Sequence, residues 1–298
     1  MKVTPLTENL IPSFKEYFKT YAHQQDESFP PDEDYVLRSD EPAYLLIDSD
    51  NKIAGAAELM MHKEYIEAKT ARFRMFHCIE KDYHNYKKLL DAILKHTKGV
   101  NDIYCFVEDK CIDTCKVWER LGFNIKRYSF VLKRDIENIT PSEFPKGYSL
   151  KTFNDGFDER AWCDIINESF ANMQGHVHMY PEKLNEWRRE PSYIKGGMKM
   201  LWHDGKPVGT MALIKESENG EDVIFIEAVG LLNSYQGRGL GKNMLRAGVE
   251  FGKNFGANSV MLSVNAENEK AADLYLKEGF KKEAVIICYS LKVNQSNI

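Results

Sequence analysis

Short, almost wholly apolar stretches alternate along the chain with longer stretches in which apolar residues recur every three or four positions. The first pattern is typical of buried β-strands and the second of amphipathic helices. Each half opens with a short strand and an amphipathic helix, at 11–23 in the first half and 159–172 in the second. Hairpin strands, a strand–loop–helix unit and a last strand, helix and strand follow. This order predicts an α/β fold with a sheet of mixed direction.

The two halves repeat each other. Residues 106–123 and 263–280 both contain a strand end, a polar turn, a helix of about three turns and a Gly-Phe pair. A strand–turn–strand match lies upstream in each half, so we expect two similar α/β domains. Prolines and polar residues interrupt both periodicities between the halves. We place the first domain at 1–137, the linker at 138–146 and the second domain at 147–298.

Composition narrows the class of protein. The 298 residues are 43% apolar and 29% charged, which is ordinary for a soluble protein with a real core. The net charge of −5 provides no general attraction to nucleic acid or to anionic membranes. Residues 1–17 contain no apolar core of signal-peptide length, and no later segment approaches 18 uninterrupted apolar residues. We therefore expect a cytoplasmic protein without a nucleic-acid or membrane partner.

The cysteines favour reduced, mostly buried thiols. They show no paired CxxC spacing and no disulfide-framework density. His77 with Cys78, or Cys111 with Cys115, could form a soft pair, but neither set completes four metal ligands. We therefore expect no metal site.

The most informative stretch follows the apolar strand 223–232. Gly237, Gly239 and Gly241 occupy alternate positions directly before an amphipathic helix. Main-chain N–H groups converge in such a loop, and the helix dipole favours negative charge. The stretch therefore predicts a phosphate site, and the alternative is a tight turn whose glycines serve packing alone.

Two common phosphate-binding patterns do not fit this loop. The dinucleotide fingerprint requires glycine where Lys242 stands. The Walker loop requires glycine at Gln236 and serine or threonine at Asn243. The pattern [Q/R]-x-x-G-x-[G/A], in contrast, fits every defined position of residues 236–241.

This loop resembles the signature of the GNAT superfamily of acetyl-CoA-dependent N-acyltransferases. A second segment, 260–280, resembles that family's pattern N-x-x-A-x-x-[LY]-Y-x-x-x-G-F. The matching residues are Asn268, Ala271, Leu274, Tyr275, Gly279 and Phe280. The resemblance spans residues 147–292 and, with the repeat, implies two tandem GNAT-like domains. Asn268 and Gly279 could equally serve only as helix caps.

The resemblance implies which residues would hold acetyl-CoA. The main chain of Val229, Gly230 and Leu231 would pair with the pantetheine arm, and one N–H would polarise the acetyl carbonyl. The pyrophosphate would lie on the loop, and Asn268 completes the cofactor set. The loop residues are Gln236, Gly237, Arg238, Gly239, Leu240, Gly241 and Lys242.

The resemblance also implies an acid and a base for direct attack of an amine on the thioester. Tyr275 would protonate the leaving thiolate, because a phenol is suitably matched to an alkylthiolate. Glu227 lies nine residues before Gln236, the spacing at which glucosamine-phosphate acetyltransferases place a catalytic glutamate. Burial in an apolar strand should raise its pKa toward a useful range. The alternative is a strand glutamate that faces solvent.

The acceptor side is expected in residues 167–191, which resemble the corresponding part of the mycothiol synthases, tandem GNAT proteins with one working half. His176, His178 and Tyr180 are our candidate acceptor contacts. His176 and His178 lack the further ligands that a metal pair would need. The acceptor implied is a small-molecule amine.

The first half lacks the residues that carry this chemistry. Residues 77–94 stand where the glycine loop would be and contain no glycine. Cys111 replaces Asn268, and Trp118 replaces Tyr275. Because an indole cannot donate a proton at neutral pH, we expect a degenerate half that serves as scaffold, acceptor-pocket wall or dimer contact.

The leading hypothesis is an acetyl-CoA-dependent N-acetyltransferase, monomeric or homodimeric, that acts through its second half on a small-molecule amine. Acetylation of a peptide or protein amine is one alternative. A CoA-responsive binding module without turnover is another.

Overall fold

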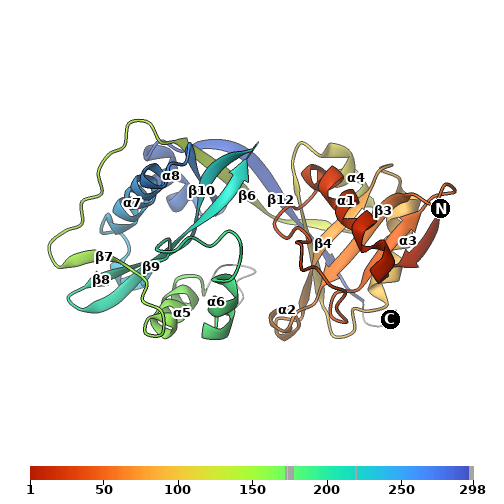
Figure 1. Ribbon diagram of the computed structural model, residues 1–298, viewed down its shortest axis with the longest axis horizontal. Coiled ribbons are helices and arrows are strands. Elements are labelled where there is room, and N and C mark those ends of the chain that lie inside the picture. The colour runs from red at the N-terminus through yellow and green to blue at the C-terminus, as the bar shows by residue number, and fades with distance from the viewer. Residues whose placement is uncertain (172, 174–177, 219, 295–298) are drawn as a thin grey trace. The chain divides into compact units, whose positions relative to one another are not determined.

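The computed structural model describes residues 1–171, 173, 178–218 and 220–294, and Figure 1 shows their course. The chain divides into two compact units, which we describe separately. The first unit is Met1–Ser129 with the C-terminal segment that begins at Ala284, and the second is Phe130–Glu283. No helix among the described residues has the length and apolar character that a membrane span requires.

The first unit is built on one sheet with helices on both faces. Its strands, in spatial order, are β1 (Lys2–Pro5), β2 (Ala43–Ile47), β3 (Ile53–Met60), β4 (Thr70–Cys78), β5 (Asp102–Glu108) and β12 (Lys281–Lys292). β4 and β5 are parallel, and the other neighbouring pairs are antiparallel. The helices are α1 (Ile11–Tyr21), α2 (Lys63–Glu67), α3 (Tyr83–Leu94) and α4 (Ile112–Arg120), with short 3-10 turns at Glu8–Leu10 and Ala22–Gln24.

Alternation along the strands separates the two cores of this unit. Leu45 and Ala56 pack in the cluster that contains α1, whereas the neighbouring Leu46 and Ala57 pack in the cluster that contains α3 and α4. Helix α1 therefore covers one face of the sheet, and α3 and α4 cover the other.

The second unit repeats this plan. Its strands, in spatial order, are β6 (Asn124–Asp135), β11 (Ser259–Asn265), β10 (Glu221–Leu231), β9 (Lys206–Glu218), β8 (Lys199–His203) and β7 (Tyr148–Thr152). β10 and β11 are parallel, and the pairs from β10 to β7 are antiparallel. The helices are α5 (Glu159–Ser169), α6 (Pro181–Trp187), α7 (Leu240–Phe255) and α8 (Glu269–Lys277), with a 3-10 turn at Asn233–Tyr235.

Strand β10 has a core on each side, which explains its nearly continuous apolar sequence. Ile224 and Ile226 pack with α7 and α8. Ala212, which pairs with Glu227, belongs to the cluster that contains α5 and α6. Because side chains alternate along a strand, Glu227 faces the α5 side.

The predicted α/β fold with a mixed sheet is confirmed. The six cysteines are free thiols and five are buried, as the sequence predicts. The linear division with a linker at 138–146 stays a prediction. The compact units differ from it because the last strand of the chain, β12, pairs with β5 of the first unit, from Ile286 opposite Glu108 to Lys292 opposite Asp102.

The structure predicts that the first unit depends on a residue near the end of the chain. Tyr289 in β12 is 1% exposed, its ring meets Trp118 edge-on at 5.7 Å, and its hydroxyl donates to Glu119 Oε1 at 2.9 Å. Tyr289→Ala should lower the free energy of unfolding by about 3–5 kcal/mol and accelerate amide exchange in β5. The exposed Glu283→Ala, at the start of the same strand, is the control. Unchanged β5 exchange in Tyr289→Ala would contradict the assignment.

Candidate active site

The second unit contains a β-bulge in the middle of β10. The register between β10 and β9 shifts between Glu227 and Gly230. Ala228 has φ of 49°, a left-handed conformation that is uncommon for a residue with a side chain. Thr210 Oγ1 donates to the carbonyl of Ala228 at 3.0 Å and so holds the bulge. Bulges of this kind commonly occur beside active sites, where they redirect main-chain groups.

The bulge lies where β10 and β11 separate. The two strands pair over residues 223–226 and 259–262, although β10 continues to Leu231 and β11 to Asn265. In the described part of the chain, no side chain bonds the main-chain N–H of Val229 or Gly230. This stretch of β10 therefore has one edge without a strand partner, the arrangement by which an extended, amide-containing ligand adds to a sheet.

The glycine loop follows this edge directly. Gly237 and Gly239 have φ of 74° and 76°, and a Cβ added at either would meet nothing within 4 Å. The two positions need glycine for the left-handed backbone rather than for packing. Gly239 precedes α7, and no side chain among the described residues caps that helix. The first N–H groups of α7 are thus available to an anion, and the helix dipole favours one.

Polar side chains of the loop stabilise its shape. Gln236 Nε2 donates to the carbonyl of Leu231 at 3.1 Å, which ties the loop to the strand end. Arg238 Nη2 donates to the carbonyl of Ser234 at 2.8 Å, and its guanidinium lies 5.0 Å from the ring centre of Tyr235. These side chains bond the loop itself, so ligand contacts are left mainly to the backbone.

Two of the predicted site residues belong to α8 and its N-cap. Asn268 caps α8, because its Oδ1 accepts the N–H of Ala271 at 3.3 Å. Tyr275 packs against the same core as Val229 and Leu231, and its ring centre lies 6.2 Å from that of Phe280. Burial raises the pKa of Tyr275, so the phenol carries its proton at neutral pH.

Glu227 is the ionisable group beside the bulge. It is partly buried, and its side chain faces the side of the sheet that α5 covers. Burial, followed by the nearby charge of Glu216, raises the pKa of Glu227 to about 7. A carboxylate with this pKa can accept a proton near neutral pH and return it readily.

The last turn of α5 holds the expected acceptor segment. Asn167 Oδ1 accepts the N–H of Met179 at 2.8 Å, and Asn167 Nδ2 lies 3.1 Å from His178 Nε2. The His178 ring centre is 4.7 Å from that of Tyr180, and both residues are exposed. His178 and Tyr180 are therefore adjacent, while His176 lies outside the described residues.

Sequence reasoning missed three groups at this place. Thr210 holds the bulge and Asn167 holds the segment at 178–179. Ser169 Oγ is buried beside Gly230 and has no hydrogen-bond partner among the described residues. The polar run Asn-Glu-Ser at the end of an apolar helix was the one available signal, since the partners of these residues are distant in sequence.

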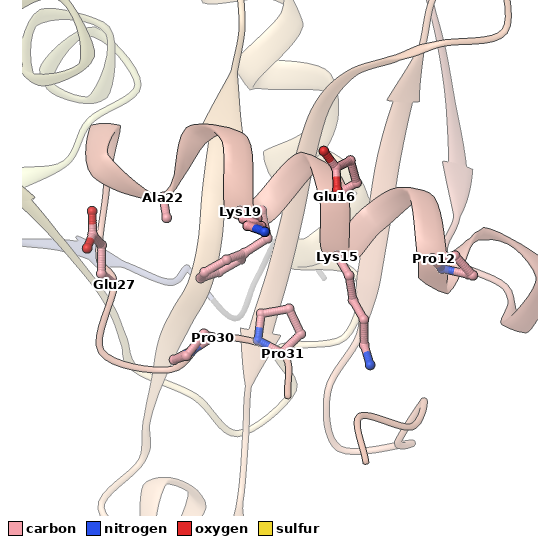
Figure 2. A pocket seen from close by; sticks show the side chains of 9 residues that line it. Pro12, Lys15, Glu16, Lys19, Ala22, Glu27, Pro30 and Pro31 are labelled. Carbon is pink, nitrogen blue, oxygen red and sulfur yellow. The ribbon is translucent and has the colours of Figure 1, made fainter. Parts of the chain in front are cut away.

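A cavity of about 500 Å³ lies in the first unit, between α1 and residues 27–31. Figure 2 shows Pro30 and Pro31 opposite the helix that carries Lys15 and Lys19. Its lining contains no predicted site residue, so size does not identify the candidate site here. In the described part of the chain, no group of three or more His, Cys, Asp or Glu side chains is placed to hold a metal ion.

Comparison with known proteins shows which proteins the chain resembles. The model of the acetyltransferase (GNAT) family matches residues 159–280, which include β10, the glycine loop and α8. This part of the chain is similar to a GNAT-family acetyltransferase domain.

Its curated relatives include mycothiol acetyltransferases. The one from Catenulispora acidiphila is 26% identical over 208 residues, which cover 68% of this chain and 66% of that protein. The one from Geodermatophilus obscurus is 26% identical over 177 residues, which cover 57% of this chain and 58% of that protein. The chain thus matches less than two thirds of the length of these relatives.

Solved structures extend the likeness of fold to nearly the whole chain. A GCN5-related N-acetyltransferase from Sphaerobacter thermophilus has a TM-score of 0.70 at 16% identity, covering 98% of this chain and 96% of that one. A tandem GNAT protein from the clavulanic acid biosynthesis pathway has a TM-score of 0.72 at 12% identity, covering 98% of each. The predicted fold of two tandem GNAT-like units is confirmed.

The loop geometry predicts opposite outcomes for two neighbouring glycines. Gly239→Ala should lower the free energy of unfolding by about 1–2 kcal/mol, because the left-handed backbone is unfavourable for alanine. Gly241→Ala, inside α7, should be neutral or stabilising by up to about 1 kcal/mol, since its Cβ would lie in ordinary contact 3.6 Å from Leu274. Denaturant unfolding of both variants measures the difference. Equal effects would show that the loop glycines serve packing.

Proposed function

We propose that this protein is an N-acetyltransferase that transfers the acetyl group of acetyl-CoA to a primary amine of a small molecule, through its second unit. The observation that carries the proposal is the continuity of the bulged, unpaired edge of β10 with the uncapped glycine loop before α7. One feature suits an amide-containing arm and the other a pyrophosphate, and acetyl-CoA contains both in that order.

Main-chain groups of the second unit are assigned to the parts of acetyl-CoA. The main chain of Val229, Gly230 and Leu231 pairs with the pantetheine arm. An N–H at the bulge donates to the acetyl carbonyl and stabilises the negative charge that develops on its oxygen. The N–H groups from Gly237 to Lys242 bind the pyrophosphate, with Gln236 and Arg238 maintaining the loop.

Proton transfers are assigned to the two flanking groups. Glu227 takes a proton from the acceptor ammonium, directly or through a water molecule, and leaves a neutral amine able to attack the thioester. Tyr275 gives its proton to the departing sulfur and regains one, through water, from the nitrogen of the new amide. Its raised pKa keeps that proton available at neutral pH.

The acceptor is proposed to approach from the α5 side, because Glu227 faces that side. His178 and Tyr180 border the approach, and Asn167 fixes the segment that carries them. A small-molecule amine is supported by the relatives, which are named mycothiol acetyltransferases. We propose the class of acceptor, a small-molecule amine, and no particular compound.

Replacing the proposed acid should separate chemistry from binding. Tyr275→Phe should lower kcat by about 10²-fold, while the Kd for acetyl-CoA stays within about twofold because the ring remains. Release of free CoA thiol against a panel of amino sugars, amino acids and short peptides measures turnover. Wild-type turnover in Tyr275→Phe would remove the acid from the mechanism. Acetyl-CoA binding without turnover on any amine would favour a regulatory module, and a preference for peptides would favour a protein acceptor.

The raised pKa of Glu227 predicts the pH dependence. Because the base form exists above the pKa, kcat/KM should rise with pH and level off above about 7. Glu227→Gln should lower the plateau by about 10²-fold and abolish this inflection. The neighbouring Glu216→Gln is the matched control and should only move the inflection to lower pH, since its charge contributes to the shift. An unchanged profile in Glu227→Gln would contradict the assignment.

A further inference from the structure

The first unit contains the counterpart of the strand separation at the candidate active site. β4 and β5 pair in parallel only over residues 70–72 and 102–104, although β4 continues to Cys78 and β5 to Glu108. The second unit separates β10 from β11 in the same way. The fold therefore supplies a cleft between two parallel strands in both units.

In the first unit this cleft contains the chain's own residues. Gln25 follows the 3-10 turn after α1 and is 7% exposed, and its Oε1 accepts the main-chain N–H of Phe76 in β4 at 3.0 Å. A side-chain amide thus bonds the strand at the place where an amide of an extended ligand would bond. The space that remains is too small for a water molecule. It is lined by Gln25, Asp26, Phe73, Arg74, Phe76, Cys105, Phe106 and Trp118.

An ion pair fixes the same segment to β4. Arg72 Nε and Nη2 lie 3.1 Å and 2.5 Å from Asp26 Oδ2, and both side chains are largely buried. The Arg72 guanidinium also lies over the rings of Phe29 and Phe106, at 4.6 Å and 4.2 Å from their centres. Because a buried charge that loses its partner is strongly unfavourable, this contact opposes displacement of the segment.

The phosphate end of the cleft is also occupied. Helix α3 follows β4 as α7 follows β10, but Asp82 caps it, accepting the N–H of Asn85 at 3.0 Å. A pyrophosphate there would meet a carboxylate already placed at the helix N-terminus. At the far wall Trp118, 1% exposed, stacks on Phe76 with ring centres 6.0 Å apart.

We propose that residues 25–29 are a built-in occupant of the first unit's cleft, with the Gln25 amide in the place of a pantetheine amide, so that the chain binds one acetyl-CoA. The identity of the cofactor rests on the proposed function. The occupancy of the cleft by residues 25–29 does not, because it is defined by contacts within the first unit.

Binding stoichiometry tests the number of sites. Native mass spectrometry and calorimetry on the full chain should show one acetyl-CoA bound, and Gly239→Glu in the second unit should bind none. Two molecules bound, or one that survives Gly239→Glu, would overturn the proposal. No binding to the wild-type chain would instead refute the proposed function, and the occupant would then be decided by amide exchange.

Amide exchange tests the occupant itself. Gln25→Met keeps the side-chain volume but removes the oxygen, so exchange at the Phe76 amide should accelerate about fivefold or more. Alkylation of Cys105, which lines the cleft, should also accelerate. Gln24→Met is the matched control, since Gln24 bonds His77 and Lys81 and not the Phe76 amide. Unchanged exchange at Phe76 in Gln25→Met would overturn the proposal, as would equal acceleration in both variants.

Discussion

The fold of each unit leaves one stretch of strand without its partner, and the rest of the structure depends on how that stretch is satisfied. Buried main-chain N–H and carbonyl groups require hydrogen bonds. Where β10 and β11 separate, the main-chain N–H groups of Val229 and Gly230 are not bonded by any described side chain. Where β4 and β5 separate, Gln25 supplies an amide oxygen. We therefore propose that the same backbone constraint produces a ligand site in one unit and an internally filled cleft in the other.

The surroundings of the two stretches follow from this difference. In the second unit the left-handed Gly237 and Gly239 lead into an uncapped helix, and Glu227 has its pKa raised to about 7 beside the bulge. In the first unit α3 begins at the carboxylate of Asp82. Arg72, which lies over two aromatic rings, holds residues 25–29 in place. In each unit the helix N-terminus and the neighbouring side chains suit the way in which the separated strand is satisfied. This is expected when two copies of a fold acquire different roles.

Sequence alone predicted the parts of the site that are local. The glycine loop and the α8 signature are continuous motifs whose residues determine their own backbone, so their position and conformation could be predicted before the structure. The bulge at Ala228 could not, because it arises from register against β9. The Gln25–Phe76 contact and the pairing of β12 with β5 could not either, since each joins residues far apart in the chain. The glycine-free loop showed that the first half differs, but not what fills it.

Amide exchange of the full chain with and without acetyl-CoA is the most direct test, because we assign acetyl-CoA binding to main-chain groups of the second unit. Acetyl-CoA should slow exchange at residues 229–231 and 237–242 and leave residues 73–78 unchanged. Slowed exchange at residues 73–78, or none at residues 229–231 under saturating acetyl-CoA, would contradict this assignment.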